Sequence, residues 1–239
     1  MKKMLLVLGG SRVGDIFHLI PFFEEHQEYL IDWVTGSYEQ TAVRLIQMIY
    51  PNIIDVQIED DGFPGNLRDR EEFVRKYGNV LDRSKFEKVV DDPTVSFDLK
   101  PNGYELKDSY VQWERTKGNY ICYHLDTISD WKRHSEIRNL MVDYPGYSLG
   151  KKGDFVLPGT IDYTGRPFKN VVDLICGCKM FVGIHSALAC LTFYINKPSV
   201  IIHPMPNLLT FGTYREQFID LVKPSTGELK KVILERLEK

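Results

Sequence analysis

Residues 12–21 read RVGDIFHLIP and directly follow the apolar run Met4–Leu8. The run has the length of a buried strand, and the glycine followed by helically spaced apolar residues indicates a strand–turn–helix unit. In open α/β sheets, ligands bind where strand ends and helix N-termini converge. Asp15 stands at this point, and its carboxylate can accept a proton from a bound hydroxyl. The stretch therefore predicts an α/β fold with function at its first turn.

Strand and helix patterns alternate on both sides of a weakly periodic middle. In the first part, apolar spacing predicts strands Met4–Leu8, Leu30–Val34 and Ile53–Ile58 and helices Asp15–Glu25 and Tyr38–Ile49. Residues 59–118 carry only weak signals, with short helices predicted at Phe73–Lys76 and Lys85–Val90. Strands that alternate with helices at this spacing are parallel, with the helices as crossovers.

The same alternation returns after residue 118. The patterns predict strands Tyr120–His124, Asp154–Leu157, Lys179–Gly183 and Pro198–His203 and helices Ser129–Val142, Phe168–Cys176, Ser186–Tyr194 and Thr226–Leu237. We therefore expect two Rossmann-like parallel-sheet domains that face a cleft. Their bounds are 1–110 and 118–224, and residues 225–239 form a terminal helix with a possible return to the first domain.

Composition narrows the function classes. The chain has 239 residues, 43% of them apolar and 26% charged, as in ordinary globular proteins. The net charge of −3 argues against a surface built mainly for nucleic acid. No apolar stretch reaches the length of a membrane span, and we expect a cytoplasmic protein. Cys176 and Cys178 make a poor zinc site without a second pair, and His18, His26, His134 and His203 show no metal-ligand spacing, so no metal site is expected. No cofactor is expected either.

The first candidate site is the glycine-rich turn GGSRVGD at residues 9–15. It lacks the Gly-Lys-Ser/Thr of a triphosphate-binding loop, and its glycine spacing is not that of a dinucleotide fingerprint. Asp15 is the candidate general base, and an alternative is that it only caps its helix. Ser11, Arg12, Gly14 and His18 complete the candidate acceptor or phosphate side, where Arg12 binds an anion or is simply solvated.

The second candidate site is GIHSALAC at residues 183–190, where a strand ends and a helix of small residues begins. Small side chains let a phosphate or sugar approach the N–H groups of the first helical turn. Ser186 can cap that helix or contact a ligand, with His185, Ala187 and Leu188 beside it. Tight helix–sheet packing explains the small residues equally well.

The third candidate site is DTISDWKR at residues 126–133. Thr127 offers a hydroxyl, and Lys132 and Arg133 offer cations, in one strand-to-helix loop. These groups suit phosphate oxygens, and a solvated loop is the alternative.

Together the three sites resemble family 9 glycosyltransferases, the heptosyltransferase-like enzymes with the GT-B fold. GDIFHLIP at 14–21 is close to the family opening Gly-Asp-(apolar)₂-His-Thr-Leu-Pro, and IDWV at 31–34 also fits. The second match covers residues 172–183, Ser186 and residues 197–200. The family has there a helix, a strand that ends in Gly-x-Asp-Ser/Thr-Gly-x-x-His, a second helix and a Pro-led strand. The weakest match is Tyr120–His124 followed by Lys132 or Arg133.

Three positions depart from the family pattern. His185 stands where the family has the Asp that contacts the donor, Ala187 replaces its Gly, and Cys190 replaces its His. The presumed base, Asp15, is retained. The chain is also shorter than the usual family member, so the resemblance implies that the first domain is reduced, with residues 59–118 as its trimmed part.

The resemblance implies an inverting glycosyltransferase that moves a sugar from a nucleotide-diphosphate donor to an acceptor hydroxyl. Asp15 would be the general base, no metal would be obligatory, and Ser186, Ala187 and Lys132 or Arg133 would lie near the donor phosphates. The acceptor stays open among a saccharide, a lipid-linked sugar and a modified nucleic-acid base. Two alternatives remain: a GT-B sugar-nucleotide epimerase that uses His185, and a non-catalytic binder of nucleotides or sugar nucleotides.

Overall fold

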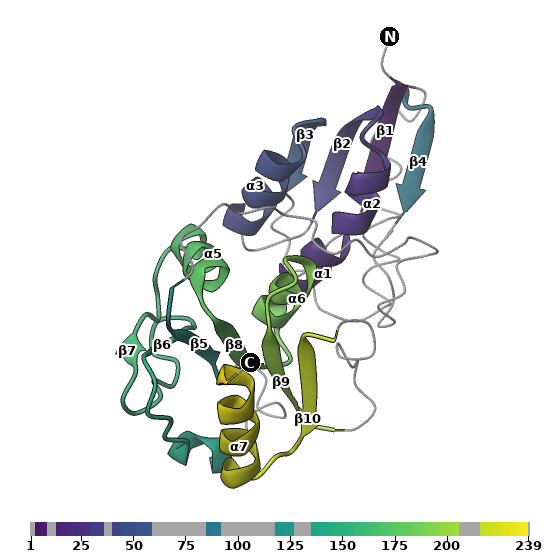
Figure 1. The fold of residues 1–239 in the computed structure, drawn as a ribbon. Coiled ribbons are helices and arrows are strands. Elements are labelled where there is room, and N and C mark those ends of the chain that lie inside the picture. Colours follow the sequence, from purple (N-terminus) through teal and green to yellow (C-terminus); the bar gives the residue numbers. More distant parts are fainter. Residues whose placement is uncertain are drawn as a thin grey trace. The chain divides into compact units, whose positions relative to one another are not determined.

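The chain forms two compact units, Met1–Tyr110 and Val111–Lys239, each built on one parallel sheet (Figure 1). The computed structural model describes residues 3–8, 13–35, 40–58, 85–91, 118–126, 135–205 and 216–238. Within these residues the two sheets have four and six strands, and they confirm the prediction of an α/β fold with two parallel-sheet units. The cleft expected between them stays a prediction.

The first sheet has the order β3-β2-β1-β4. Its strands are β1 (Lys3–Leu8), β2 (Tyr29–Thr35), β3 (Ile53–Ile58) and β4 (Lys88–Asp91). All three pairings are parallel. The described helices of this unit are α1 (Val13–His18), α2 (Ile20–Glu25) and α3 (Gln40–Ile49). The aromatic ring of Phe23 contacts those of Trp33 and Tyr50 at centroid distances of 5.2 and 5.9 Å.

Two predicted elements of this unit are wrong in detail. The single helix Asp15–Glu25 is split at Leu19, because Pro21 has no N–H to donate to the preceding turn. The predicted helix Lys85–Val90 is instead strand β4, whose Lys88–Asp91 pairs with Leu5–Leu8. Backbone pairing with the open edge of β1 decides the structure of this segment, because its own helical pattern is weak. The helix predicted at 73–76 lies outside the described residues.

The second sheet has the order β10-β9-β8-β5-β6-β7, again with every pairing parallel. Its strands are β5 (Ile121–His124), β6 (Gly146–Ser148), β7 (Ile161–Asp162), β8 (Met180–Ile184), β9 (Ser199–His203) and β10 (Phe218–Val222). The described helices are the 3₁₀ helix η3 (Ser135–Asn139), α5 (Phe168–Gly177), α6 (Ala187–Tyr194) and α7 (Thr226–Leu237).

The predicted strand Asp154–Leu157 is wrong, and its hydrogen bonds give the reason. The N–H of Phe155 donates to Asp126 Oδ2 at 3.0 Å, and that of Leu157 donates to Ser148 Oγ at 2.9 Å. The segment thus pairs with side chains instead of a neighbouring strand. Within the predicted helix Ser129–Val142, the described part holds only η3. Strands β6, β7 and β10 were not predicted.

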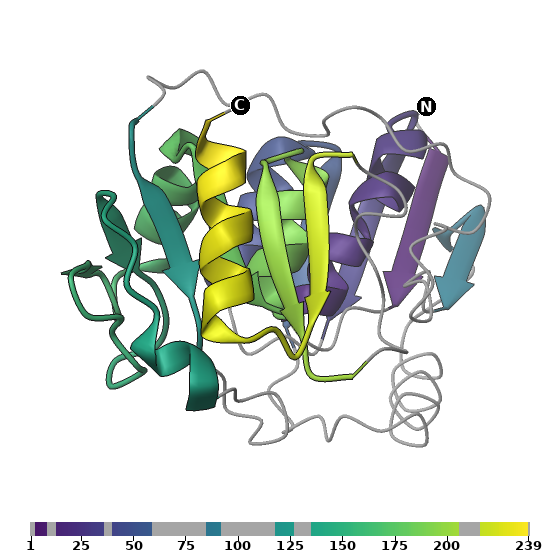
Figure 2. The ribbon, with the colours of Figure 1, turned by 60° about the horizontal axis from the view of Figure 1, so that its bottom comes forward.

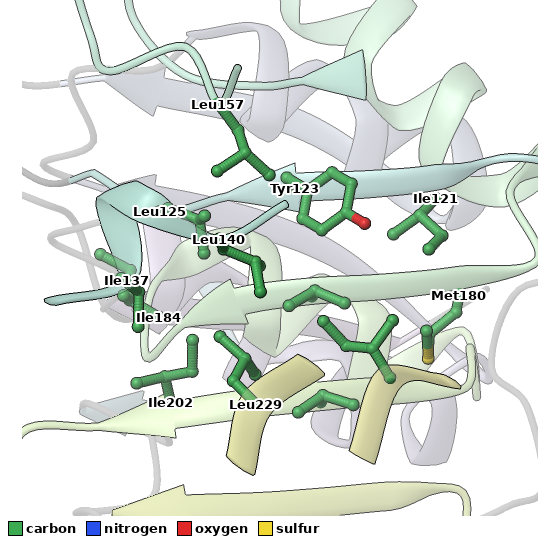
Figure 3. Packing of buried hydrophobic residues seen from close by; sticks show 13 residues of the cluster. Ile121, Tyr123, Leu125, Ile137, Leu140, Leu157, Met180, Ile184, Ile202 and Leu229 are labelled. Carbon is green, nitrogen blue, oxygen red and sulfur yellow. The ribbon is translucent and has the colours of Figure 1, made fainter. Parts of the chain in front are cut away.

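The core of the second unit lies between the sheet and α7 (Figure 3). Ile121 and Tyr123 of β5 and Val182 of β8 pack with Leu229 and Ile233 of α7. The helix begins at the predicted capping box, because the N–H of Glu228 donates to Ser225 Oγ at 3.2 Å. It lies along one face of the second sheet (Figure 2), and Leu229 and Ile233 pack into the core of this unit. The possible return of residues 225–239 to the first domain stays a prediction.

A glycine at the start of β6 allows Tyr123 to fill this core. A Cβ at Gly146 would lie 2.7 Å from Tyr123 Cε2, and Tyr123 is only 2% exposed. Gly146→Ala is expected to lower the free energy of unfolding by about 1–3 kcal/mol, because the buried ring has to shift. Chemical denaturation measures the change.

The matched control is Gly227→Ala in the first turn of α7, where a Cβ meets nothing within 4 Å. This variant is expected to be neutral or stabilised by up to about 1 kcal/mol, since alanine lowers the entropy of the unfolded chain. Equal losses in both variants would contradict the packing account.

Candidate functional site

The order of the second sheet fixes where a ligand can bind. The chain proceeds outward through β5, β6 and β7, then returns to β8 on the other side of β5 and continues through β9 and β10. The strand order therefore reverses between β5 and β8. In open parallel sheets, ligands bind outside the carboxyl ends of the strands at such a switch point.

A hydrogen bond spans this switch point. His124 is the last residue of β5, and its Nδ1 lies 3.0 Å from Ser186 Oγ, directly after β8. Ser186 is the N-cap residue of α6, but its side chain makes no capping hydrogen bond. From the sequence, the Ser186 hydroxyl could cap the helix or contact a ligand. In the structure it contacts His124 and does not cap the helix.

The start of α6 presents backbone donors to the same place. The first helical hydrogen bond has Cys190 N donating to Ser186 O at 3.1 Å, so the N–H groups of residues 187–189 precede the helical ladder. No acidic residue lies in the first turn of α6. Such a turn favours anions, because its N–H groups and the helix dipole present positive charge.

Burial keeps His124 neutral. Desolvation lowers its pKa from the ordinary 6.5 to about 4, against the opposing influence of Asp154 and Asp126. At neutral pH its imidazole therefore has one N–H donor and one acceptor nitrogen. It can exchange a hydrogen bond with Ser186 without adding a charge to the site.

Two further histidines continue the row of imidazoles at this edge. His203 ends β9, and its Nε2 lies 2.6 Å from Asp220 Oδ1 of β10. The ring of His185 lies 5.5 Å from that of His203, centroid to centroid, at an interplanar angle of 44°. Tyr123 and Ile202, which directly precede His124 and His203, point into the core on the α7 side. Because successive side chains of a strand point to opposite faces, the two histidines project from the other face of the sheet.

The structure brings together one of the three predicted clusters. His185, Ser186 and Ala187 are half-buried at the β8–α6 turn, whereas the side chain of Leu188 is buried and leaves only its backbone N–H for a ligand. Of the third cluster, Asp126 is buried and accepts a hydrogen bond from the N–H of Phe155. The other predicted phosphate contacts, Thr127, Lys132 and Arg133, lie outside the described residues.

The first unit has its own switch point. Its order β3-β2-β1-β4 reverses between β1 and β4, and α1 follows β1 along the chain. Gly14 and Asp15 lie in the first half of α1, and the half-buried His18 ends it. Ser11 and Arg12 lie outside the described residues. The proposed roles of all five residues stay predictions.

Sequence reasoning missed three residues of the second site: His124, His203 and Asp220. The signal was present for the histidines, because each ends a predicted strand and parallel strands bring their carboxyl ends to one edge. Asp220 lies in β10, which was not predicted. Within the described parts of the chain, no group of three His, Cys, Asp or Glu side chains has metal-binding geometry.

No family model and no curated protein matches the sequence. Solved structures do match its fold. A family 9 glycosyl transferase from Veillonella parvula aligns at 13% identity with a TM-score of 0.67, over 99% of this chain and 98% of that one. An E. coli heptosyltransferase aligns with TM-scores of 0.63 in its structure with ADP and 0.60 with ADP-2-deoxy-2-fluoro heptose. Those alignments have 13% and 14% identity and cover 98% and 97% of this chain and 99% of that one.

A Listeria monocytogenes protein described as a UDP-N-acetylglucosamine 2-epimerase aligns at 8% identity with a TM-score of 0.56, over 100% of this chain and 89% of that one. The two parallel sheets thus have the GT-B fold, with a structural match to family 9 glycosyltransferases over nearly the full chain. Among the described helices, none is long and apolar enough to cross a membrane.

The low pKa of His124 predicts a pH-dependent stability. Between about pH 6.5 and pH 4 the unfolded chain binds a proton that the folded protein does not, so the free energy of unfolding falls as the pH falls. His124→Asn, which can retain a hydrogen bond to Ser186, is expected to flatten this slope. Urea denaturation at several pH values measures it.

Ser186→Ala is the control, because it removes the hydroxyl and leaves His124 in place. It is expected to keep most of the slope. A His124 titration near pH 6.5 by NMR, or an unchanged slope in His124→Asn, would contradict the burial account.

Proposed function

We propose that this protein is a glycosyltransferase that moves a sugar from a nucleotide-diphosphate donor to an acceptor hydroxyl with inversion. The observation that carries the proposal is the β8–α6 turn at the switch point of the second sheet. It presents backbone donors and small side chains within a fold shared with glycosyltransferases.

The donor side of the proposal rests on the start of α6. The N–H groups of residues 187–189 would bind the diphosphate, with Ser186 and Ala187 small enough to let it approach. Thr127 and Lys132 or Arg133, next along the chain after β5, would contact the phosphate oxygens. The bound ADP and ADP-sugar analogue of the E. coli heptosyltransferase support a nucleotide sugar as the ligand.

The acceptor side of the proposal rests on Asp15. Its carboxylate would take the proton of the acceptor hydroxyl while the acceptor oxygen attacks the anomeric carbon. The bond from that carbon to the phosphate oxygen breaks, and the nucleoside diphosphate leaves with the electron pair. A single displacement inverts the anomeric carbon, and backbone N–H groups with the cationic loop would stabilise the leaving group without an obligatory metal.

A second candidate is a sugar-nucleotide epimerase, which the likeness to the Listeria protein favours. It predicts that a sugar nucleotide is isomerised when no acceptor is present, whereas a transferase leaves the donor sugar unchanged. Chromatography of the nucleotide sugar after incubation separates the two. A saccharide, a lipid-linked sugar or a modified nucleic-acid base remains the proposed acceptor, and a cytoplasmic location remains a prediction.

Ala187→Asp tests the diphosphate site. A carboxylate in the first turn of α6 interacts favourably with the helix dipole, so stability is expected to hold or rise slightly. The same charge repels a diphosphate, and affinity for the best-bound of ADP, UDP, GDP and CDP is expected to fall about tenfold or more. Calorimetry measures affinity and thermal unfolding measures stability.

Ala187→Asn is the matched control, since it has the shape of Asp without the charge. Its loss of affinity measures the effect of side-chain size, and Ala187→Asp is expected to bind clearly more weakly than Ala187→Asn. Equal affinity in the parent and in Ala187→Asp would place the nucleotide elsewhere.

Asp15→Asn tests the proposed base. The donor is first identified as the nucleotide sugar that raises the melting temperature. Release of nucleoside diphosphate is then followed with saccharide, lipid-linked and nucleic-acid acceptors. With the best acceptor, Asp15→Asn is expected to lower turnover by about 10²–10⁴ and to leave donor binding intact.

Asp55→Asn, at an exposed position on β3 of the same unit, is the control and should turn over like the parent. Parental turnover in Asp15→Asn would refute the proposed base.

A further inference from the structure

Three side chains from three neighbouring elements connect the outer strand of the second sheet to the β8–α6 turn. Asp220 of β10 contacts His203 of β9 at 2.6 Å, and the ring of His203 contacts that of His185 at 5.5 Å. The side chains of His203 and Asp220 are 1% and 10% exposed, respectively. The contacts therefore form a largely buried chain that ends at the residue before Ser186.

The carboxylate of Asp220 influences the tautomer and the orientation of the His203 ring. A carboxylate oxygen 2.6 Å from an imidazole nitrogen is placed to accept a hydrogen bond, which favours the tautomer of His203 with its N–H at Nε2. This contact also fixes the rotation of the ring, which is enclosed by the protein. A ring that is fixed in position and contacts His185 restricts where the imidazole of His185 can lie.

The opposite side of the turn is held as well. His124 at the end of β5 contacts Ser186, so adjacent residues of the turn are held from two sides, one from β5 and one from β9 and β10. The ring nitrogens of His185 are buried, although the residue as a whole is half-exposed. This burial favours a structural role for the ring over direct contact with the ligand.

Stability alone does not explain why Asp220 and His203 are buried together. Burying an imidazole and a carboxylate costs desolvation free energy that apolar residues of similar size avoid. Fixed geometry is the property that the polar pair supplies, and displacements of about an ångström at a binding site have large effects on ligand affinity and rate.

We propose that Asp220 and His203 are positioning residues that, through His185, hold the β8–α6 turn in the geometry that binds the donor diphosphate. The inference rests on the proposed function, since it concerns how the same site is held in place. It adds two residues to the site, neither of which touches the donor.

The test is a double-mutant cycle between Asp220 and His185, two residues linked through His203. Affinity for the best-bound of ADP, UDP, GDP and CDP is measured by calorimetry. His185→Ala and Asp220→Asn are each expected to weaken it by about tenfold, and the double variant by no more than either alone, because both remove one pathway. Asp173→Asn on α5 is the matched control and should bind like the parent.

A second readout needs no ligand. The imidazole NMR signals of His185, assigned by their loss in His185→Ala, are expected to shift in Asp220→Asn and to stay in place in Asp173→Asn. If Asp220→Asn fails to fold, His203→Gln takes its place in the cycle. Its amide can still donate to Asp220, but it removes the ring that contacts His185.

The outcomes separate the two proposals. If the parent binds none of the four nucleotides, the proposed function fails and this inference fails with it. If the parent binds one of them but Asp220→Asn binds equally well, only the positioning role is overturned. Additive losses in the double variant, with unmoved His185 signals, would likewise overturn it, because they would indicate that Asp220 and His185 act independently.

Discussion

The parallel pairing of β5 with β8 is the constraint on which the account of the second unit depends. Cys122 pairs with Phe181 and His124 with Gly183, across a gap of more than fifty residues in the chain. The chain continues from β5 to one side of the sheet and from β8 to the other. The loops that follow these two adjacent strands therefore diverge, and a crevice for a ligand remains between the carboxyl ends of the strands. The contact between His124 and Ser186 and the start of α6 all lie there.

Alternation along the strands explains why the histidines of the site lie on the face opposite α7. Alternation along β5 sends Ile121 and Tyr123 into the core under α7, and sends His124 to the opposite face. Both faces of the sheet are packed, because Phe181 and Ile201 alternate with the α7-side residues and are also buried. On the face opposite α7, the imidazoles and the carboxylate lie toward the carboxyl ends of the strands, where such groups are costly to bury but are suited to fixing a turn.

Sequence reasoning reached the strands and helices with strong periodicity and the β8–α6 turn, because these depend on local patterns. It failed where long-range pairing decides: Lys88–Asp91 becomes a strand because β1 has a free edge, and Phe155 turns away from strand geometry to meet Asp126. The Asp220–His203–His185 chain was out of reach for the same reason. Its members lie on different strands, and only the strand order brings them together.

The central claim is that the start of α6 binds the diphosphate of a nucleotide, and a crystal structure with the best-bound nucleoside diphosphate tests it most directly. The account predicts phosphate oxygens within hydrogen-bonding distance of the backbone N–H groups of residues 187–189, beside Ser186. A nucleotide bound away from the carboxyl ends of β5 and β8 would contradict it.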